Sequence, residues 1–329
     1  MKKSKILLNA ITVVVLIAII APLLACTCAA ADGKNNYIKW VDFGITAKAL
    51  KDAMEIDIES YDSEKPIPWI GLLATLGVKY GGNFSLYKNA DMQKVAQAYM
   101  GGKSFQEIAK NEKLYNYYKT AYEAVLGGML GEHTEIDEDG NKSEGYGLTA
   151  YAPLAYGYGF SHYDDFGAAR SYGYKRHHLG HDLMGAVGTP VIAVEAGYVE
   201  ACGWNQYGGW RIGIRSFDGK RYYYYAHLRR GHPYNDIYEG KIVNAGEVIG
   251  YLGMTGYSPK EDVNNIDTPH LHFGLQLIFD PKQKDGTNQI WIDLFALTEF
   301  LSMNKSKTAK STDGEYYAKT VRIPKNAWD

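Results

Sequence analysis

Residues 270–277 read HLHFGLQL, an alternation of polar and apolar residues that is typical of a β-strand. Successive side chains of a β-strand point to opposite faces of the sheet. One face of this stretch therefore carries four apolar side chains, namely Leu271, Phe273, Leu275 and Leu277. The other face carries His270, His272, Gly274 and Gln276. We predict a strand that buries its apolar face in a core and projects two imidazoles from the opposite face.

Other short β-type runs surround this strand from Leu148 onward. They are separated by glycine, proline and asparagine, and they include PVIAVEAGYVEAC, WRIGIRSF, KRYYYYAHL and KIVNAGEVIGYLG. Asp218-Gly219 is typical of a hairpin turn between two of them. We predict a mostly antiparallel β-domain over residues 148–303, which closes with a helix or strand-helix edge at IWIDLFALTEFLSM. A polar C-terminal tail is predicted over residues 304–329.

Histidine is concentrated in the predicted β-domain, which holds eight of the nine histidines of the chain. HHLGHDLMG, residues 177–185, supplies His178 and Asp182 four residues apart, and His227 follows a predicted strand. Two imidazole nitrogens and one carboxylate oxygen would leave a fourth position for water, which is the open arrangement of a catalytic zinc site. The alternative is a set of histidines scattered over the core and the surface.

These residues resemble those of the lysostaphin/LytM-type zinc endopeptidases, metallopeptidase family 23, which cleave bacterial peptidoglycan cross-links. The resemblance runs over roughly residues 156–279. It rests on short motifs, namely DDFGAAR at 164–170, HxxxD at 178–182, GTPV at 188–191, AGYV at 196–199, YAHL at 225–228 and HLH at 270–272. The helical region that precedes the β-domain lies outside it.

The resemblance implies a metalloendopeptidase with one Zn²⁺ per chain, held by His178, Asp182 and His272. It makes His227 and His270 the two catalytic histidines that do not bind the metal. One of them would orient or deprotonate the attacking water while the other stabilises the oxyanion, and the sequence does not assign these roles. His181 departs from the family pattern and makes a second HxxxH spacing with His177. We interpret both as residues at the rim of the site or behind its ligands.

Residues 32–130 carry helical signals and predict a module of three to five helices that folds separately from the β-domain. Ser104 and Glu107 form a capping-box pattern, and Asp91 is a candidate cap for MQKVAQAYM. The module contains no cluster of candidate catalytic groups, so we interpret it as a packing or spacer unit. The acidic stretch GEHTEIDEDGNKSEGYG, residues 131–147, lacks apolar periodicity and is predicted to be a linker.

Residues 1–31 are predicted to be a membrane anchor or signal segment. Three lysines precede the apolar run ILLNAITVVVLIAIIAPLL, residues 6–24, which is about the length needed to span a bilayer. We expect a protein anchored to the outer face of the cytoplasmic membrane in a bacterial cell envelope. Lipidation at Cys26 and cleavage after Ala31 are the alternatives. Only Cys202 lies in the body of the chain, which therefore cannot form a disulfide of its own.

The composition limits the possible partners. The chain of 329 residues has a formal charge of −2, which argues against a dedicated nucleic-acid binder. Its 28 tyrosines, Tyr222 to Tyr225 among them, either contact a peptide or glycan or fill sheet surfaces. We predict an α+β protein that binds peptidoglycan. The competing function is that of a membrane-anchored, non-hydrolytic scaffold or glycan-binding protein. The sequence does not identify the bond cleaved, protein partners or the oligomeric state.

Overall fold

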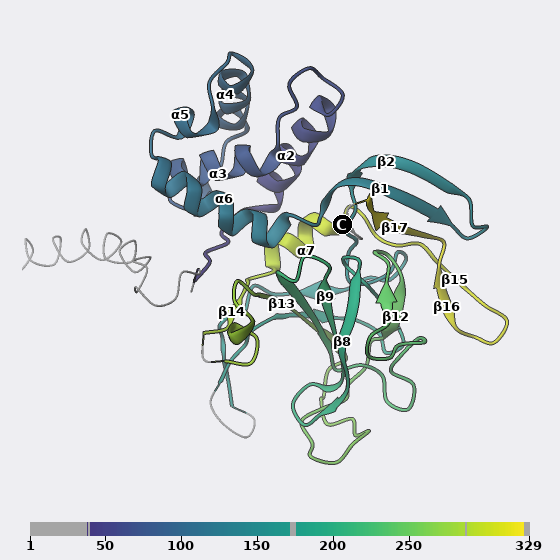
Figure 1. Ribbon diagram of the computed structural model, residues 1–329. Helices are drawn as coiled ribbons and strands as arrows, with labels where there is room; N and C mark the ends of the chain where they lie inside the picture. The colour runs from purple at the N-terminus through teal and green to yellow at the C-terminus, as the bar shows by residue number, and fades with distance from the viewer. Residues whose placement is uncertain (1–37, 39, 172–175, 287, 326–329) are drawn as a thin grey trace, which may run out of the picture.

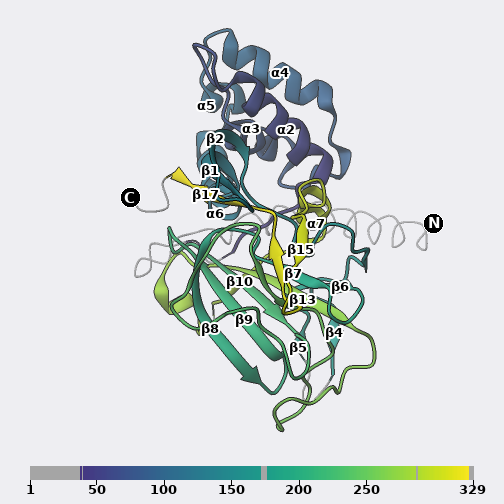
Figure 2. The same cartoon turned by 90° about the vertical axis from the view of Figure 1, so that its right-hand side faces the viewer.

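The computed structural model describes residues 38, 40–171, 176–286 and 288–325 (Figure 1). The helices lie together at one end of the molecule, and the β-domain extends away from them (Figures 1 and 2). The predicted anchor, residues 1–31, falls outside the described residues. In the part of the chain that is described, no helix has both the length and the apolar character needed to cross a membrane.

The helical module contains five α-helices among the described residues, in agreement with the prediction of three to five. They are α2 (Ala47–Ser60), α3 (Trp69–Tyr80), α4 (Asn89–Met100), α5 (Phe105–Ala109) and α6 (Glu112–Leu126), with the short 3₁₀ helix η1 (Phe84–Leu86) between α3 and α4. The predicted capping box of Ser104 and Glu107 starts α5. Helix α4 begins at Asn89, so Asp91 lies in its first turn instead of capping it.

The β-domain is built on one eight-stranded sheet in the described chain. Its strands are β3 (Ser161–His162), β6 (His181–Met184), β8 (Gly197–Asn205), β9 (Gly209–Ser216), β10 (Arg221–Ala226), β11 (Ile242–Val243), β13 (His270–Leu277) and β14 (Ile290–Trp291). Their order is β11-β8-β9-β10-β13-β6-β3, and β14 also pairs with β13. All of these pairs are antiparallel, which confirms the predicted sheet type.

Two-stranded sheets complete the domain. They pair β7 (Pro190–Ile192) with β12 (Val248–Tyr251), and β4 (Ala169–Arg170) with β5 (Arg176–His177). The alternation predicted for β13 is confirmed, because Leu271, Phe273, Leu275 and Leu277 are all fully buried. The predicted Asp218-Gly219 turn joins β9 to β10, with Gly219 in the left-handed region.

The acidic segment 131–147 is not a linker, and this prediction was wrong. It forms most of a hairpin of β1 (Leu130–Asp137) and β2 (Lys142–Leu148). The described part of the C-terminal tail is also ordered, as β15 (Thr308–Lys310), β16 (Tyr316–Ala318) and β17 (Thr320–Pro324). Strand β17 pairs with β1, and Arg322 Nε donates to Glu135 Oε2 at 2.9 Å. These polar strands lack apolar periodicity because most of their residues are exposed or only partly buried.

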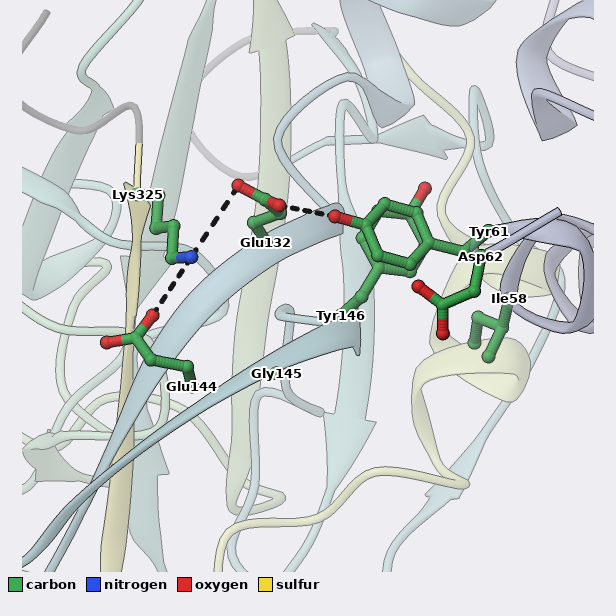
Figure 3. A pocket seen from close by; sticks show the side chains of 8 residues that line it. All are labelled: Ile58, Tyr61, Asp62, Glu132, Glu144, Gly145, Tyr146 and Lys325. Carbon is green, nitrogen blue, oxygen red and sulfur yellow. Dashed lines mark hydrogen bonds and ion pairs between the residues drawn. The ribbon is translucent and has the colours of Figure 1, made fainter. Parts of the chain in front are cut away.

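The hairpin is also docked on the helical module. The rings of Tyr61, next to the end of α2, and Tyr146 of β2 stack with centroids 3.7 Å apart. The hydroxyl of Tyr146 donates to Asp57 Oδ1 at 2.5 Å. The stacked pair forms one wall of a cavity of about 370 Å³, in which Lys325 lies between Glu132 and Glu144 (Figure 3). The hydroxyl of Tyr61 donates to Glu132, so Tyr61, Tyr146 and Lys325 all have acidic partners within the chain.

The helices and the β-domain share one hydrophobic core. A continuous cluster of buried side chains runs from Val41 through the helices and the sheet to α7 (Phe295–Leu301). Trp69 of α3 packs against Phe300 of α7, with ring centroids 6.3 Å apart. Arg221 Nη1 of β10 donates to the Ala124 carbonyl of α6 at 2.9 Å. The helical module is therefore packed into the sheet domain instead of being tethered to it.

Candidate metal centre

Two neighbouring strands bring the predicted metal ligands together. Strands β6 and β13 are antiparallel partners, and their register places Asp182 opposite His272. His178 lies four residues before Asp182, just ahead of β6. These three residues are the one group of three or more His, Cys, Asp or Glu in the described chain whose donor atoms converge as a metal site requires.

The donor atoms form a compact triangle. His178 Nε2 lies 3.0 Å from Asp182 Oδ1 and 3.1 Å from His272 Nδ1, and His272 Nδ1 lies 2.9 Å from Asp182 Oδ1. Tetrahedral zinc with bonds of about 2.0–2.1 Å to nitrogen and oxygen requires ligand separations of about 3.3 Å. Two imidazoles and one carboxylate are also a donor set that suits zinc. The residues present therefore fit a zinc ion with small adjustments.

The charges at the triangle favour an ionised carboxylate. Burial works against the charged form of Asp182, but its interactions with His178 and His272 outweigh burial and hold the pKa of this carboxyl far below its usual range. Burial also disfavours charge on the two rings. For His272 burial prevails and lowers its pKa, whereas for His178 the hydrogen bond and charge of Asp182 prevail and raise its pKa.

His227 and His270 lie beside the triangle without being part of it. Their ring centroids are 4.8 Å apart, and His227 is 5.9 Å from the ring of His272. His270 Nε2 is 3.8 Å from Asp182 Oδ1. Each ring places Nδ1 2.8 Å from a backbone carbonyl oxygen, that of Thr255 for His227 and that of Thr268 for His270. Because Nδ1–H donates to these carbonyls, the lone pair of each ring is on Nε2.

The backbone around His227 is held in an uncommon conformation. His227 has a φ of 61°, in the left-handed region, and its N–H donates to the Gly208 carbonyl at 2.7 Å. Burial, together with the positive charges that His270 and His272 can carry, lowers the pKa of His227 well below its ordinary value. The ring is therefore neutral at physiological pH.

Glycine makes room for one of the candidate ligands. A Cβ at Gly180 would lie 2.5 Å from Cε1 and Nε2 of His272, which is closer than real contacts allow. A residue with a side chain at this position would displace the His272 ring.

His177 and His181 differ in their positions. His177 is exposed, with Nδ1 2.9 Å from the Gly167 carbonyl oxygen, in agreement with a place at the rim. His181 is only 1% exposed and is not at the rim. Its Nε2 lies 2.7 Å from His162 Nδ1, and it packs edge-on against Phe295. Burial and the neighbouring His162 lower the pKa of His181 to about 4.

The tyrosines of β10 divide between the core and the site. Tyr223 and Tyr225 are fully buried, and each hydroxyl is hydrogen-bonded. Tyr224 projects from the face that carries the histidines, with its ring 6.0 Å from that of His272 and 6.3 Å from that of Trp291. Tyr222 lies on the same face but is buried, so Tyr224 is the one partly exposed tyrosine of this strand and a candidate for substrate contact.

Sequence reasoning assigned no individual role to two residues at the centre, Asp165 and Arg170. Both touch the candidate ligands directly, within 3.2 Å. They lie in the DDFGAAR motif, which was noted for its resemblance to the family but not for its chemistry.

Comparisons with known proteins find relatives of the segment that carries this site. The profile of peptidase family M23 matches residues 176–285, a range that contains all five site residues named from the sequence. The L-Ala--D-Glu endopeptidase of Bacillus subtilis is 42% identical over 165 residues, which are 49% of this chain and 47% of that protein. Lysostaphin of Staphylococcus staphylolyticus is 40% identical over 97 residues, which are 29% of this chain and 18% of lysostaphin. The chain therefore matches less than half the length of each relative.

A solved structure shows the same fold over a larger part of the chain. It is that of a protein from Ruminococcus gnavus described as a candidate glycyl-glycine endopeptidase lytM. The TM-score is 0.54 at 20% sequence identity, and the match covers 83% of this chain and 93% of the other. The matched part of this chain is longer than the β-domain, so it includes helices as well as the sheet. The same arrangement of helices and sheet therefore occurs in another protein.

Proposed function

Because residues 176–285 form a domain of peptidase family M23, we propose that the chain is a zinc-dependent endopeptidase that hydrolyses peptide cross-links of bacterial peptidoglycan. The observation that carries this proposal is the triangle of His178, Asp182 and His272 with two further imidazoles beside it. One Zn²⁺ would be held by the triangle. The domain is that of a metalloendopeptidase, and the relative from Bacillus subtilis is named as an L-Ala--D-Glu endopeptidase.

A zinc ion at these donors would supply Lewis-acid activation of water and of the scissile carbonyl. His227 and His270 provide the proton transfers. Their Nε2 lone pairs are free to accept a proton from the attacking water because Nδ1 of each ring is held by a carbonyl. A ring that has taken up this proton can stabilise the oxyanion or return the proton to the leaving amine. Asp182 remains ionised throughout, since its pKa is far below neutrality.

The competing function is a non-hydrolytic, membrane-anchored scaffold or glycan-binding protein on the same fold. Such a protein has no need for two histidines with oriented Nε2 lone pairs beside a preformed triangle of donors. The geometry therefore favours hydrolysis.

Zinc content and wall digestion test the proposal together. We expect the purified full chain to bind one zinc per molecule and to release new amino termini from purified peptidoglycan. A chelator should abolish the release, and added zinc should restore it. A protein that binds zinc but releases nothing would support the scaffold instead. Mass spectrometry of the released fragments would identify the bond cleaved.

We also propose that the chain is anchored in the cell envelope through residues 6–24. The lysine-flanked apolar run supports this proposal. Fractionation of cells that express the full chain should recover it with the membrane. Recovery in the medium after cleavage at Ala31 would contradict the anchor, and release by Cys26→Ala would indicate a lipoprotein.

A further inference from the structure

A carboxylate and a guanidinium lie directly behind the donor triangle, and the proposed chemistry does not use them. Asp165 and Arg170 belong to the segment that precedes His178. Their side chains are 27% and 33% exposed, so both are partly screened from solvent. Each of them contacts a candidate ligand.

Asp165 contacts the ring nitrogen of His178 that is not part of the triangle. Asp165 Oδ1 lies 3.1 Å from His178 Nδ1, on the side of the ring away from the triangle. A carboxylate at this position accepts the Nδ1–H and leaves the lone pair of Nε2 for a metal. Such an outer carboxylate fixes the orientation of a ligand histidine and raises its basicity.

Arg170 ties this carboxylate to the ligand carboxylate. Its Nη2 lies 2.7 Å from Asp165 Oδ2 and 3.1 Å from Asp182 Oδ2. The histidines contact the other oxygen of Asp182, Oδ1. One guanidinium nitrogen therefore bridges two carboxylates and leaves Oδ1 of Asp182 directed to the triangle.

The backbone holds both residues against the ligand segment. Strand β4, which ends at Arg170, pairs with β5 immediately before His178. The His178 N–H donates to the Ala168 carbonyl at 2.9 Å, and the Gly167 N–H donates to the His178 carbonyl at 2.8 Å. Asp165 and Arg170 are therefore fixed relative to His178 by main-chain hydrogen bonds.

We propose that Asp165 and Arg170 are positioning residues of the metal centre. Asp165 orients the ring of His178, and Arg170 links Asp165 to the outer oxygen of Asp182 so that this carboxylate offers one oxygen to the metal. This inference rests on the proposed function for the presence of a metal. It assigns a role to two residues that lie outside the segment matched by the family profile.

Zinc affinity of the full chain, measured by competition with a chromophoric chelator, tests the proposal. We expect Asp165→Ala to weaken zinc binding by ~10–100-fold. Asp165→Asn should weaken it less, because the amide oxygen still accepts the Nδ1–H without the charge. The matched control is Asp164→Ala, which removes the same group from an exposed neighbour and should leave the affinity unchanged.

Arg170→Ala tests the bridge. Removing this side chain frees the outer oxygen of Asp182, so the visible absorption spectrum of the cobalt-substituted protein should change, while Asp164→Ala should not alter it. In the double variant of Asp165 and Arg170, the loss of zinc affinity should be smaller than the product of the two single losses, because both act through one linkage.

The outcomes distinguish the positioning role of Asp165 and Arg170 from the proposed hydrolysis of peptidoglycan. The proposal is wrong if Asp165→Ala, Asp165→Asn and the parent bind zinc with equal affinity. It is also wrong if the double variant loses as much zinc affinity as the product of the two single losses. Asp165→Asn has the shape of the parent residue, so it keeps the test decisive if the alanine variant does not fold. A parent chain that binds zinc and shows these effects, but does not digest wall, would refute the proposed hydrolysis and leave the positioning role standing.

Discussion

At the residue scale, His270 and His272 project from the same face of β13 but meet different neighbours. His272 Nδ1 is part of the triangle, whereas His270 Nε2 is 3.8 Å from Asp182. We expect His272→Ala to lose both zinc and activity. His270→Ala should keep its zinc and lose turnover by ~10²–10⁴-fold, as for a positioned acid-base group.

Zinc analysis and wall digestion of both variants check this prediction. His177→Ala is the control, because this exposed histidine lies away from the triangle. A zinc-free His270→Ala protein together with a zinc-replete His272→Ala protein would reverse the assignment.

Gly180 provides a second prediction at this scale. A methyl group at this position would overlap the His272 ring, so Gly180→Ala should weaken zinc binding without removing a donor. The control is Gly147→Ala, where a Cβ meets no other atom within 4 Å. Chelator competition measures both affinities. An unchanged affinity for Gly180→Ala would show that the ring has more freedom than the structure indicates.

At the element scale, apolar alternation made strand β13 and the face that carries His270 and His272 predictable from the sequence, whereas the ligand and catalytic roles came from the resemblance to the zinc endopeptidases. Strand β13 has a strict period of two because its inner face is fully buried. The hairpin β1-β2 was missed because its strands are mostly polar and because β1 pairs with β17, which is distant in the chain. The roles of Asp165 and Arg170 were missed for a related reason, since they depend on contacts with Asp182 and His178 that no local spacing encodes.

Where strand β10 meets helix α6, Arg221 forms a buried ion pair with Glu195, which leads to a stability prediction. Arg221 is 2% exposed, and it donates from Nε and Nη2 to Glu195 and from Nη1 to the Ala124 carbonyl. Arg221→Met leaves the buried Glu195 without its cation, so we expect the free energy of unfolding to fall by about 3–5 kcal/mol.

Denaturant unfolding measures this loss. The control is Arg230→Ala, which breaks an exposed ion pair with Asp262 at 3.6 Å and should change the free energy of unfolding by about 0–1 kcal/mol. Equal effects of the two substitutions would mean that the buried pair does not stabilise the junction between helix and sheet.

At the scale of the whole molecule, the continuous core argues against the expectation that the helices fold separately. Buried side chains of α3 and α6 belong to the same cluster as those of the sheet. A chain truncated to begin at Gly147 would also lose β1 and most of its hairpin. We therefore expect it to unfold at lower denaturant concentration than the full chain, or to aggregate. Unchanged stability and zinc affinity would show that the helices are an independent unit.

We propose that this chain hydrolyses peptide bonds of peptidoglycan through the centre at His178, Asp182 and His272. Mass spectrometry of fragments released from purified wall tests it most directly, with the zinc-loaded parent and zinc-loaded His270→Ala side by side. We predict peptide cleavage at one kind of bond by the parent and its near absence with the variant. Intact wall after incubation with the zinc-loaded parent, or equal cleavage by both proteins, would contradict the claim.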